Sequence, residues 1–440
     1  MASQRTISNP DAQTMPHTAD VVIIGGGPAG TAALWAIERL APGTKTVLIE
    51  QQERLGAGSS TAALECYRTC WPTVCLAEQM QRSIAVFHNA DEYLGEGAAN
   101  AIHLKEQGYL FCAFTEAQAA GLKQDVARLH EIGLTHIEYL EAEEVQYRFG
   151  WVGERVIAAK FDPVAGWLDS NALIYRYAQS APSAKILLGV AQVEIHVEGG
   201  CVVGVKIPAG EIRTGAVILA AGANVRAIGR TAKLDLPVTV IPRQSFTTGW
   251  RHEPFPEHSP MIISAAPYPH VRPEAKVGAI FGWEYTWNSR RVREMGYDAP
   301  LPDAMLEPIY PAHPLKDPRF PSLTLAWMAR QFGHAPGTGF ANPRYLQGLH
   351  HNIGYYVYRS TAAAHRPDGS PYHSERAILD RVPSVEGLFL SIAHGGHGIM
   401  TSAGAGEIIA SLVLDMPFVN PSAADFGLDV AWVEHDESVL

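Results

Sequence analysis

Residues 20–50 constrain the fold more strongly than any other part of the 440-residue chain. Val21–Ile24 is a short apolar run, and Gly25, Gly27 and Gly30 follow it with the spacing G-x-G-x-x-G. A run of helix-forming residues comes next, and a second apolar run then ends in an acidic residue. A strand, a glycine turn, a helix and a second strand in this order predict a βαβ unit that binds a dinucleotide.

Each part of this unit has a physical task. Gly25 permits the tight turn, Gly27 lets the backbone approach a pyrophosphate, and Gly30 lets the helix pack closely on the strand. The N-terminus of the helix presents unpaired N–H groups and a partial positive charge to the phosphates. Glu50, 20 residues after Gly30, is placed to accept hydrogen bonds from a ribose. The motif alone does not distinguish FAD from NAD.

Composition limits the class of protein and its partners. With 47% hydrophobic and 18% charged residues, the chain has enough apolar side chains for a sizeable core, and its length favours two domains. A net charge of −11 argues against a nucleic-acid partner. An anionic substrate would therefore need a local arginine or lysine. No apolar run is long enough for a membrane span.

The two ends and the cysteines favour a cytoplasmic location. Residues 1–19 are polar and lack an apolar core, which predicts a disordered leader and not a secretory signal. Residues 418–440 are an acidic tail without clear periodicity. The spacing of the five cysteines matches no zinc or redox pattern, so we expect free thiols and no metal site.

A second loop of small residues follows Glu50. Gly58, Ser59 and Ser60 lie in this loop and would let a flat ring approach the backbone. Arg68 comes next, between aromatic residues. It is either an ordinary surface arginine or the anchor for an acidic substrate.

A glycine-rich loop near the C-terminus repeats the pattern of the first. A predicted strand over 388–392 leads into AHGGHGIMTSAGAG, and a helix follows with Thr401 or Ser402 as its N-cap. The dipole of this helix would stabilise negative charge on a bound ring. His394 and His397 are the candidate bases of the loop, although a structural role is the simpler interpretation of His397.

Four stretches in combination resemble the D-amino-acid-oxidase-like FAD oxidoreductases, on the branch of sarcosine and dimethylglycine oxidoreductases. The stretches are VVIIGGGPAG with LIE, GSSTAALECYRTCW, GAVILAAGAN and GGHGIMTSAGAGEIIASLVL. GYYVYRS (354–360) is also similar to a stretch of that family. The resemblance covers residues 20–420 and is weakest over 91–155 and 250–345.

The resemblance implies an α/β fold with a Rossmann-type FAD-binding domain, discontinuous in sequence, and an α+β substrate domain with an antiparallel sheet. The FAD-binding domain is expected over 20–90, 155–235 and 346–417. The substrate domain is expected over 91–154 and 236–345.

The resemblance also implies which residues hold FAD. It puts Glu50 at the ribose, Val193 by the adenine, Gly222 under the ADP portion and the last glycine-rich loop along the isoalloxazine. The expected FAD-binding residues are Gly25, Gly27, Pro28, Ala29, Gly30, Glu50, Gln51, Ser59, Ser60, Thr61, Val193, Ala221, Gly222, Gly396, His397, Gly398, Ile399, Met400 and Thr401. The histidine and cysteine positions that attach flavin covalently in related proteins are not occupied by such residues, so we expect non-covalent FAD.

The expected catalytic residues are Arg68, His394, Tyr356, Tyr358 and Met400. Arg68 matches a family arginine near the flavin that can hold a substrate carboxylate. Met400 stands where members with fast oxygen chemistry carry a lysine, which leaves the electron acceptor open between oxygen and another molecule.

The main hypothesis is an FAD-dependent oxidoreductase that oxidises the C–N bond of an amino acid or N-substituted amine. Hydride would pass to the flavin N5, and water would hydrolyse the imine. The substrate would be a small amine with a carboxylate. One alternative is an FAD-dependent 2-hydroxy-acid dehydrogenase, and another is a flavin-binding assembly or scaffold protein with little turnover.

Overall fold

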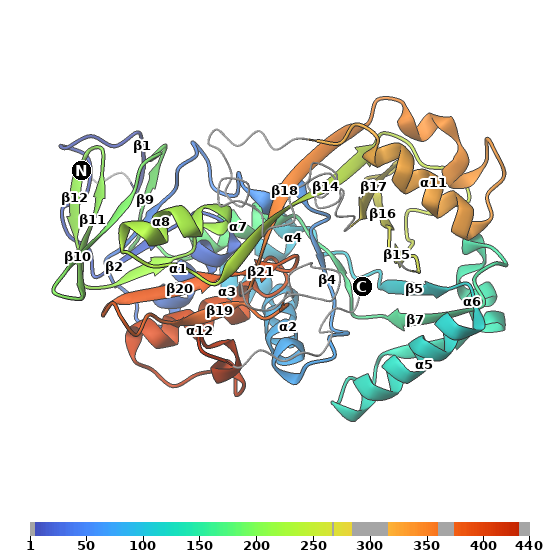
Figure 1. Cartoon of the computed structure of the whole chain (residues 1–440), viewed down its shortest axis with the longest axis horizontal. Helices are drawn as coiled ribbons and strands as arrows, with labels where there is room; N and C mark the ends of the chain where they lie inside the picture. Colours follow the sequence, from blue (N-terminus) through green and yellow to red (C-terminus); the bar gives the residue numbers. More distant parts are fainter. Residues whose placement is uncertain (1–4, 266–267, 284–315, 360–373, 431–440) are drawn as a thin grey trace, which may run out of the picture.

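The computed structural model describes residues 5–265, 268–283, 316–359 and 374–430, and its two large sheets lie in opposite halves of the molecule (Figure 1). One sheet has seven strands, all parallel to their neighbours except the last, antiparallel pair. In spatial order its strands are β1 (Thr6–Ser8), β9 (Lys185–Leu188), β3 (Thr46–Ile49), β2 (Val21–Ile24), β13 (Val217–Leu219), β20 (Leu388–Ile392) and β19 (Ile378–Arg381).

The seven-stranded sheet is covered on both faces, which explains why its strands read as continuous apolar runs. Val21 and Ile23 of β2 belong to one buried cluster, and Val22 and Ile24 belong to another. The first cluster includes residues of α1 (Pro28–Leu40), α2 (Val74–His88), α7 (Ser170–Gln179) and α12 (Ser402–Leu414). The second includes residues of α8 (Val225–Thr231) and of the small sheet β10 (Glu194–Glu198), β11 (Cys201–Ile207) and β12 (Gly210–Arg213).

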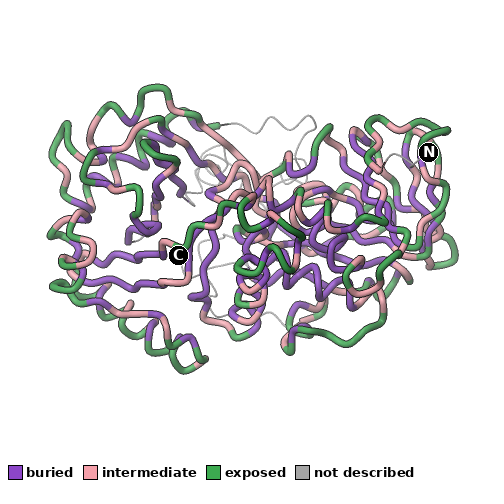
Figure 2. The backbone as a smooth tube through the Cα atoms, turned by 180° about the vertical axis from the view of Figure 1, so that it is seen from behind, coloured by how far each residue is buried: buried purple, intermediate pink, exposed green. Residues whose placement is uncertain are grey.

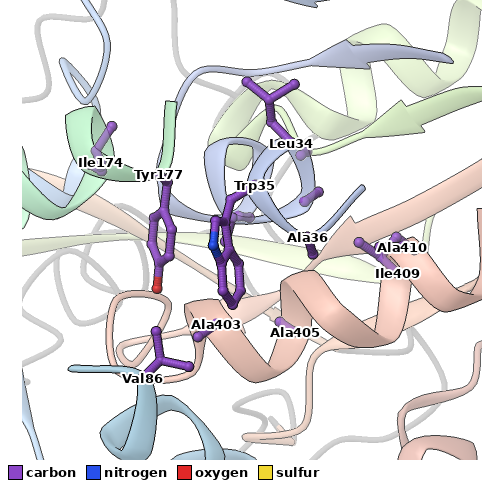
Figure 3. Close-up of a cluster of buried hydrophobic side chains, with 14 of the residues drawn as sticks. Leu34, Trp35, Ala36, Val86, Ile174, Tyr177, Ala403, Ala405, Ile409 and Ala410 are labelled. Atoms are coloured by element: carbon purple, nitrogen blue, oxygen red, sulfur yellow. The ribbon is translucent and has the colours of Figure 1, made fainter. Parts of the chain in front are cut away.

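Helices α1 and α12 pack unusually closely because small residues line their contact. A Cβ atom added to Gly406 would lie 2.6 Å from the backbone carbonyl carbon of Ala32. Beside this contact, the rings of Trp35 and Tyr177 lie 5.4 Å apart, and Figure 3 shows both close to Ala403 at the start of α12. Each helix begins at one of the two glycine-rich loops.

The other large sheet has nine strands. Its neighbours are antiparallel except for one parallel pair, β15 with β5, which the expectation of an antiparallel sheet did not include. In spatial order the strands are β21 (His394–Gly395), β18 (His350–Arg359), β14 (Val238–Thr248), β17 (Gly278–Trp283), β16 (His270–Glu274), β15 (Met261–Ile263), β5 (Tyr109–Ala113), β7 (Ala158–Asp162) and β6 (Glu138–Glu141).

The two faces of the nine-stranded sheet differ in what covers them. Leu110 and Ile262 pack in a cluster with residues of α11 (Phe320–Phe332). Tyr109 and Phe111 belong to a cluster on the opposite face.

The remaining strands and α-helices are β4 (Cys66–Tyr67), β8 (Gly166–Trp167), α3 (Ala90–Leu94), α4 (Ala98–Ile102), α5 (Glu116–Glu131) and α6 (Ala142–Phe149). In the described part of the chain, no helix combines the length and apolar character that crossing a bilayer requires.

The leader expected to be disordered over 1–19 is ordered where the structure describes it. Residues 6–8 form β1, which pairs in parallel with β9, and Met15 is buried. Arg5 donates a hydrogen bond of 2.6 Å to the carbonyl of Ala181. The prediction was wrong here because an edge strand needs only backbone pairing, which a polar sequence provides equally well.

Two strands belong to the sheet of the other expected domain, and part of the expected C-terminal tail is buried. β7 lies within 155–235 but pairs with β5 and β6, and β18 lies within 346–417 but pairs along β14. In the tail, Phe426 is fully buried and its carbonyl accepts a hydrogen bond of 3.1 Å from Arg359.

Figure 2 shows buried residues running through the strands of both halves. All five cysteines are free thiols, as expected.

A buried histidine next to α11 predicts a loss of stability in acid. The backbone N–H of His252 donates to the hydroxyl of Tyr345 at 3.1 Å, and Nδ1 of His252 lies 2.7 Å from the same hydroxyl. Burial and the neighbouring His334 lower the pKa of His252 to about 4. Between pH 6.5 and 4 the unfolded chain therefore takes up a proton that folded His252 does not, and the unfolding free energy falls.

We expect His252 to account for about 2 kcal/mol of the stability lost between pH 7 and pH 5. Urea denaturation at both pH values measures this loss. His252→Gln removes the titrating group, so its stability should change less on acidification than that of the wild type. The same pH dependence in both proteins would contradict the assignment.

Candidate active site

A cavity of about 1000 Å³ lies where the two large sheets meet. This volume is at the upper end of the roughly 300–1,000 Å³ typical of small-molecule sites. Ile24, Ile49 and Ile392, the last residues of three parallel strands, line it. The carboxyl ends of parallel strands are where open α/β sheets bind their ligands.

The first glycine-rich loop forms one end of the cavity. Gly25 has a φ of +120°, and a Cβ atom there would lie 2.3 Å from the carbonyl oxygen of Ala220, so only glycine fits. At Gly27 no atom lies within 4 Å of an added Cβ, which leaves the backbone open to the cavity. Helix α1 starts at the next residue, so its N-terminal N–H groups point towards the same space.

Glu50 holds the turn that precedes α1. Its carboxylate accepts hydrogen bonds from the backbone N–H groups of Gly26 at 2.7 Å and Gln52 at 2.8 Å. Burial raises the pKa of Glu50, while these two donors oppose the rise. Each carboxylate oxygen retains acceptor capacity towards the cavity.

The last glycine-rich loop forms a second wall, and its two histidines differ. His397 places Nε2 2.6 Å from the carbonyl oxygen of Glu375 and Nδ1 3.2 Å from the carboxylate of the same residue. Its ring packs 4.8 Å from that of Trp71. These contacts favour the structural interpretation of His397.

His394 lines the cavity, and one of its ring nitrogens has no hydrogen-bond partner among the described residues. Its Nε2 lies 3.2 Å from Oγ of Ser391, whereas Nδ1 is buried and has no hydrogen-bond partner among the described residues. Burial and the nearby His397 lower the pKa of His394 to about 4. His394 is therefore neutral at pH 7 and is a weak base.

Arg68 lies in the wall between the two loops and is only 4% exposed. Its guanidinium carbon lies 4.2 Å from the centre of the Trp71 ring and 5.8 Å from that of Phe111. Nη1 is buried and has no hydrogen-bond partner among the described residues. Among the described residues of the cavity wall there is no other arginine and no lysine.

A fully buried carboxylate fixes the backbone that carries Arg68. Asp162, at the end of β7, accepts hydrogen bonds from the N–H groups of Thr69 at 2.8 Å and Cys70 at 3.1 Å, and from the Thr69 hydroxyl at 2.9 Å. Nε2 of His136 lies 2.6 Å from the same hydroxyl. These contacts join the segment after Arg68 to the nine-stranded sheet.

Most of the residues expected at the site do line the cavity. They are Gly25, Gly27, Pro28, Ala29, Glu50, Gln51, Ser59, Ser60, Arg68, Val193, Ala221, Gly222, Tyr356, His394, Gly396, His397, Gly398, Ile399 and Met400. Gly30, Thr61, Tyr358 and Thr401 are not part of the wall.

The four residues outside the wall have contacts that account for their positions. A Cβ atom at Gly30 would lie 1.9 Å from the carbonyl oxygen of Gly25, which is the close helix packing expected of the third glycine. Thr61 donates to the carbonyl of Gly58 at 3.3 Å, and Thr401 to that of His397 at 3.0 Å. Tyr358 is only 2% exposed.

Several residues of the site were absent from the sequence predictions. Trp71 packs on Arg68 and His397, Glu375 fixes His397, and His270 lines the wall from β16. Position beside Arg68 was the only signal for Trp71. His270 had none, because the pairing of distant strands brings it to the cavity.

The fold and the cavity define a dinucleotide-dependent α/β enzyme, in which two helix N-termini converge on one ligand site. The residues fit FAD: open backbone at Gly27 suits the pyrophosphate, Glu50 suits the ribose, and the glycines of the last loop leave space for a flat ring. Residues 20–412 match the family described as FAD dependent oxidoreductase (DAO), and the chain belongs to this family.

Curated relatives are distant in sequence. Dimethylglycine dehydrogenase of Rattus norvegicus is 23% identical over 246 residues, which cover 55% of this chain and 28% of that protein. This chain thus spans little more than a quarter of the dimethylglycine dehydrogenases that it matches. The FAD-dependent oxidoreductase domain-containing protein 1 homolog of Drosophila melanogaster is 22% identical, over 91% of this chain and 76% of the homolog.

Solved structures share the fold over nearly the whole chain. L-proline dehydrogenase from P. horikoshii has a TM-score of 0.73 and 20% identity, over 94% of this chain and 98% of its own. Glycine oxidase from Geobacillus kaustophilus has a TM-score of 0.66 and 19% identity, over 96% and 100%.

We expect Glu50→Gln to weaken FAD binding about 10- to 150-fold, because charge-assisted hydrogen bonds to the ribose contribute roughly 1.5–3 kcal/mol. Titration of the apoprotein with FAD, followed by quenching of flavin fluorescence, measures the affinity. The thermal midpoint of the apoprotein is the control for the turn at Gly26. An unchanged affinity would mean that Glu50 does not contact the ribose.

The flavin should be released without cleavage of a bond to the chain. Acid precipitation of the yellow protein is expected to leave FAD in the supernatant, because no residue of the usual kind stands at the positions where related proteins attach flavin covalently. Absorbance spectra of pellet and supernatant decide the question. Yellow colour that stays in the pellet would contradict non-covalent binding.

Proposed function

We propose that the protein oxidises the C–N bond of an amino acid or an N-substituted amine that carries a carboxylate. The observation that carries the proposal is the state of Arg68, which is buried in the cavity wall with Nη1 unpartnered among the described residues. A buried donor without a partner is costly unless a ligand satisfies it. A carboxylate suits the planar guanidinium because it can accept two parallel N–H···O bonds.

The charge of the protein supports the same role for Arg68. A chain with a net charge of −11 repels anions on average, so it needs a local cation to hold one. The named substrates of similar proteins, proline, glycine and dimethylglycine, are all carboxylate-bearing amines. They support the same class of substrate for this chain.

The histidines of the cavity favour an amine over a 2-hydroxy acid. An alcohol usually needs a general base whose pKa lies near the operating pH, whereas a neutral amine can lose hydride without a strong base. Burial is the main cause that lowers the pKa values of His394 and His270, both to about 4. Neither side chain is therefore a strong base at neutral pH.

The residues of the chain bind, orient and shield the reactants. The two glycine-rich loops and Glu50 hold the dinucleotide, and Arg68 orients the substrate through its carboxylate. Met261 and Ile263 contribute apolar wall that excludes water. When bound, FAD supplies the two-electron oxidation of the substrate C–H bond. The amine, having lost a hydride from carbon and a proton from nitrogen to solvent, becomes an imine, and water hydrolyses the imine to a carbonyl compound and ammonia or an amine.

We expect Arg68→Ala to raise the KM of a carboxylate-bearing amine about 30- to 1,000-fold, since removal of one partner of a buried charge pair costs roughly 2–4 kcal/mol. The matching amide, which lacks the negative charge, should be affected far less. Steady-state kinetics with both substrates measure the difference, and the flavin content of each preparation is the control.

Arg68→Lys keeps the positive charge but loses the planar fork, so it should also bind the carboxylate poorly. Equal losses for the carboxylate and the amide would mean that Arg68 is not the substrate anchor. If the Arg68→Ala protein is purified without flavin, Arg68 instead serves to bind the cofactor.

A further inference from the structure

The wall opposite the glycine-rich loops carries a histidine with no role so far. His270 begins β16, and its direct register partners are Ile263 on β15 and Gly282 on β17. Ile263 pairs in turn with Phe111 on β5, whose ring lies 5.8 Å from the Arg68 guanidinium carbon. Directly paired residues project from the same face of a sheet. His270 and Arg68 therefore belong to the same part of the cavity.

The backbone around His270 determines which ring nitrogen carries the proton. Nδ1 lies 3.0 Å from the carbonyl oxygen of Tyr268. Because a carbonyl only accepts, Nδ1 must be the protonated nitrogen of the neutral ring. Nε2 then has a free lone pair and acts only as an acceptor.

The imidazole ring of His270 packs over Gly282. A Cβ atom added to Gly282 would lie 2.4 Å from Nε2 of His270 and 2.7 Å from a methyl carbon of Leu64, so no larger residue fits there. Nε2 forms no hydrogen bond with any residue in the described ranges, and the ring is only partly buried in the wall that it lines. A molecule in the cavity can therefore reach this nitrogen.

The surroundings keep His270 neutral. Its pKa is lowered to about 4, mainly by burial, with the hydrogen bond to Tyr268 opposing the shift and the positive charge of Arg68 adding to it. At neutral pH the wall thus presents a cationic donor at Arg68 and a neutral acceptor at His270. An amine with a carboxylate and an N–H bond has the complementary pair of groups.

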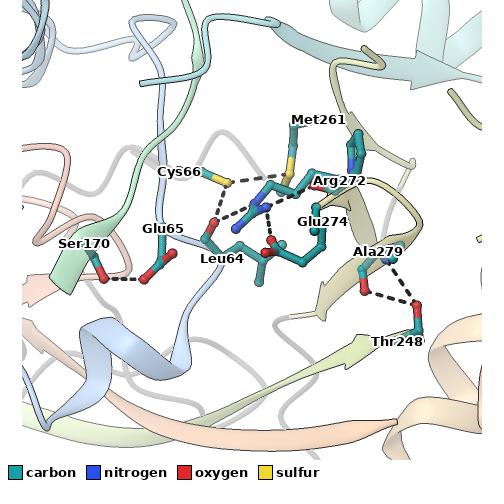
Figure 4. Close-up of polar contacts among 12 residues, drawn as sticks. Leu64, Glu65, Cys66, Ser170, Thr248, Met261, Arg272, Glu274 and Ala279 are labelled. Atoms are coloured by element: carbon teal, nitrogen blue, oxygen red, sulfur yellow. Dashed lines mark hydrogen bonds and ion pairs between the residues drawn. The ribbon is translucent and has the colours of Figure 1, made fainter. Parts of the chain in front are cut away.

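Two other polar side chains in this region, Arg272 and Glu65, already form hydrogen bonds within the protein. Arg272 lies on the same strand face as His270 but is buried, and it donates to the carbonyls of Leu64 at 2.8 Å and Pro273 at 3.0 Å (Figure 4). Glu65 accepts a hydrogen bond from the hydroxyl of Ser170, and Figure 4 shows these two side chains together. The Arg272 contact also ties β16 to the segment that leads to Arg68.

We infer that Nε2 of His270 accepts a hydrogen bond from the N–H group of the substrate, so that the site selects primary and secondary amines over tertiary amines. This inference rests on the proposed function, because it requires an amine whose carboxylate is held by Arg68. A neutral tertiary amine has no N–H to donate, so it leaves the acceptor in the wall without a partner. A site built around a hydrogen bond discriminates strongly against an analogue that lacks it.

Kinetics of the FAD-loaded protein with N-methylglycine and N,N-dimethylglycine test the inference. The two substrates share the carboxylate and differ in the N–H bond. We expect the wild type to prefer N-methylglycine by about 10-fold or more in kcat/KM. His270→Phe keeps a ring but removes the acceptor, so the preference should fall to about 1. His270→Gln retains an acceptor near the position of Nε2 and should restore part of the preference.

Binding of two unreactive acids gives a readout that does not depend on turnover. Pyrrole-2-carboxylate and furan-2-carboxylate have similar shape and the same anionic group, but only the pyrrole has an N–H donor. Calorimetry should show about 10-fold tighter binding of the pyrrole to the wild type and no difference with His270→Phe. The flavin spectrum and thermal midpoint of each variant confirm that it is folded and loaded.

The outcomes separate this inference from the proposed function. Equal losses for both members of each pair in His270→Phe, or no preference in the wild type, would overturn the role of His270 while amine oxidation stands. If no amine reduces the flavin without oxygen and neither acid binds, the proposed function itself fails, and the inference fails with it.

Discussion

The contact between α1 and α12 is the constraint on which the cofactor half of the structure depends. Gly406 and Ala32 meet so closely that one added methyl group would strike backbone. Helix α1 starts in the cavity wall and α12 starts just after Met400 of that wall, so their contact aims two positive helix ends at one ligand. A larger residue at the crossing would separate the two glycine-rich loops, although neither loop would change in sequence.

The substrate half depends on a different kind of interaction. Asp162 is fully buried, yet it sits at the end of a strand where backbone N–H groups of the Arg68 segment satisfy it. This arrangement lets the protein present a buried arginine whose own fork remains available. The cost of burying the carboxylate is offset by at least three hydrogen bonds.

Sequence patterns predicted the parts of the structure that local chemistry determines. The glycine spacing at Gly25–Gly30, the acid at Glu50 and the last loop with its helix all lie where the patterns indicated. Residues whose position depends on pairing between distant strands were not predictable. His270 reaches the cavity only because β5, β15, β16 and β17 are in register, and β1 is an edge strand without an apolar pattern. Gly30 has the helix-packing role that its spacing predicted, but it was also expected to bind the cofactor and it does not line the cavity.

The cavity wall extends from Ile24 to Met400, and this order along the chain has a consequence for biosynthesis. Domains fold from the N-terminus as a chain leaves the ribosome. Here the first glycine loop leaves the ribosome long before its partner helix α12 (Ser402–Leu414). A nascent chain therefore has no complete flavin site until α12 has left the ribosome. FAD can occupy the complete site only after both glycine-rich loops have folded onto each other.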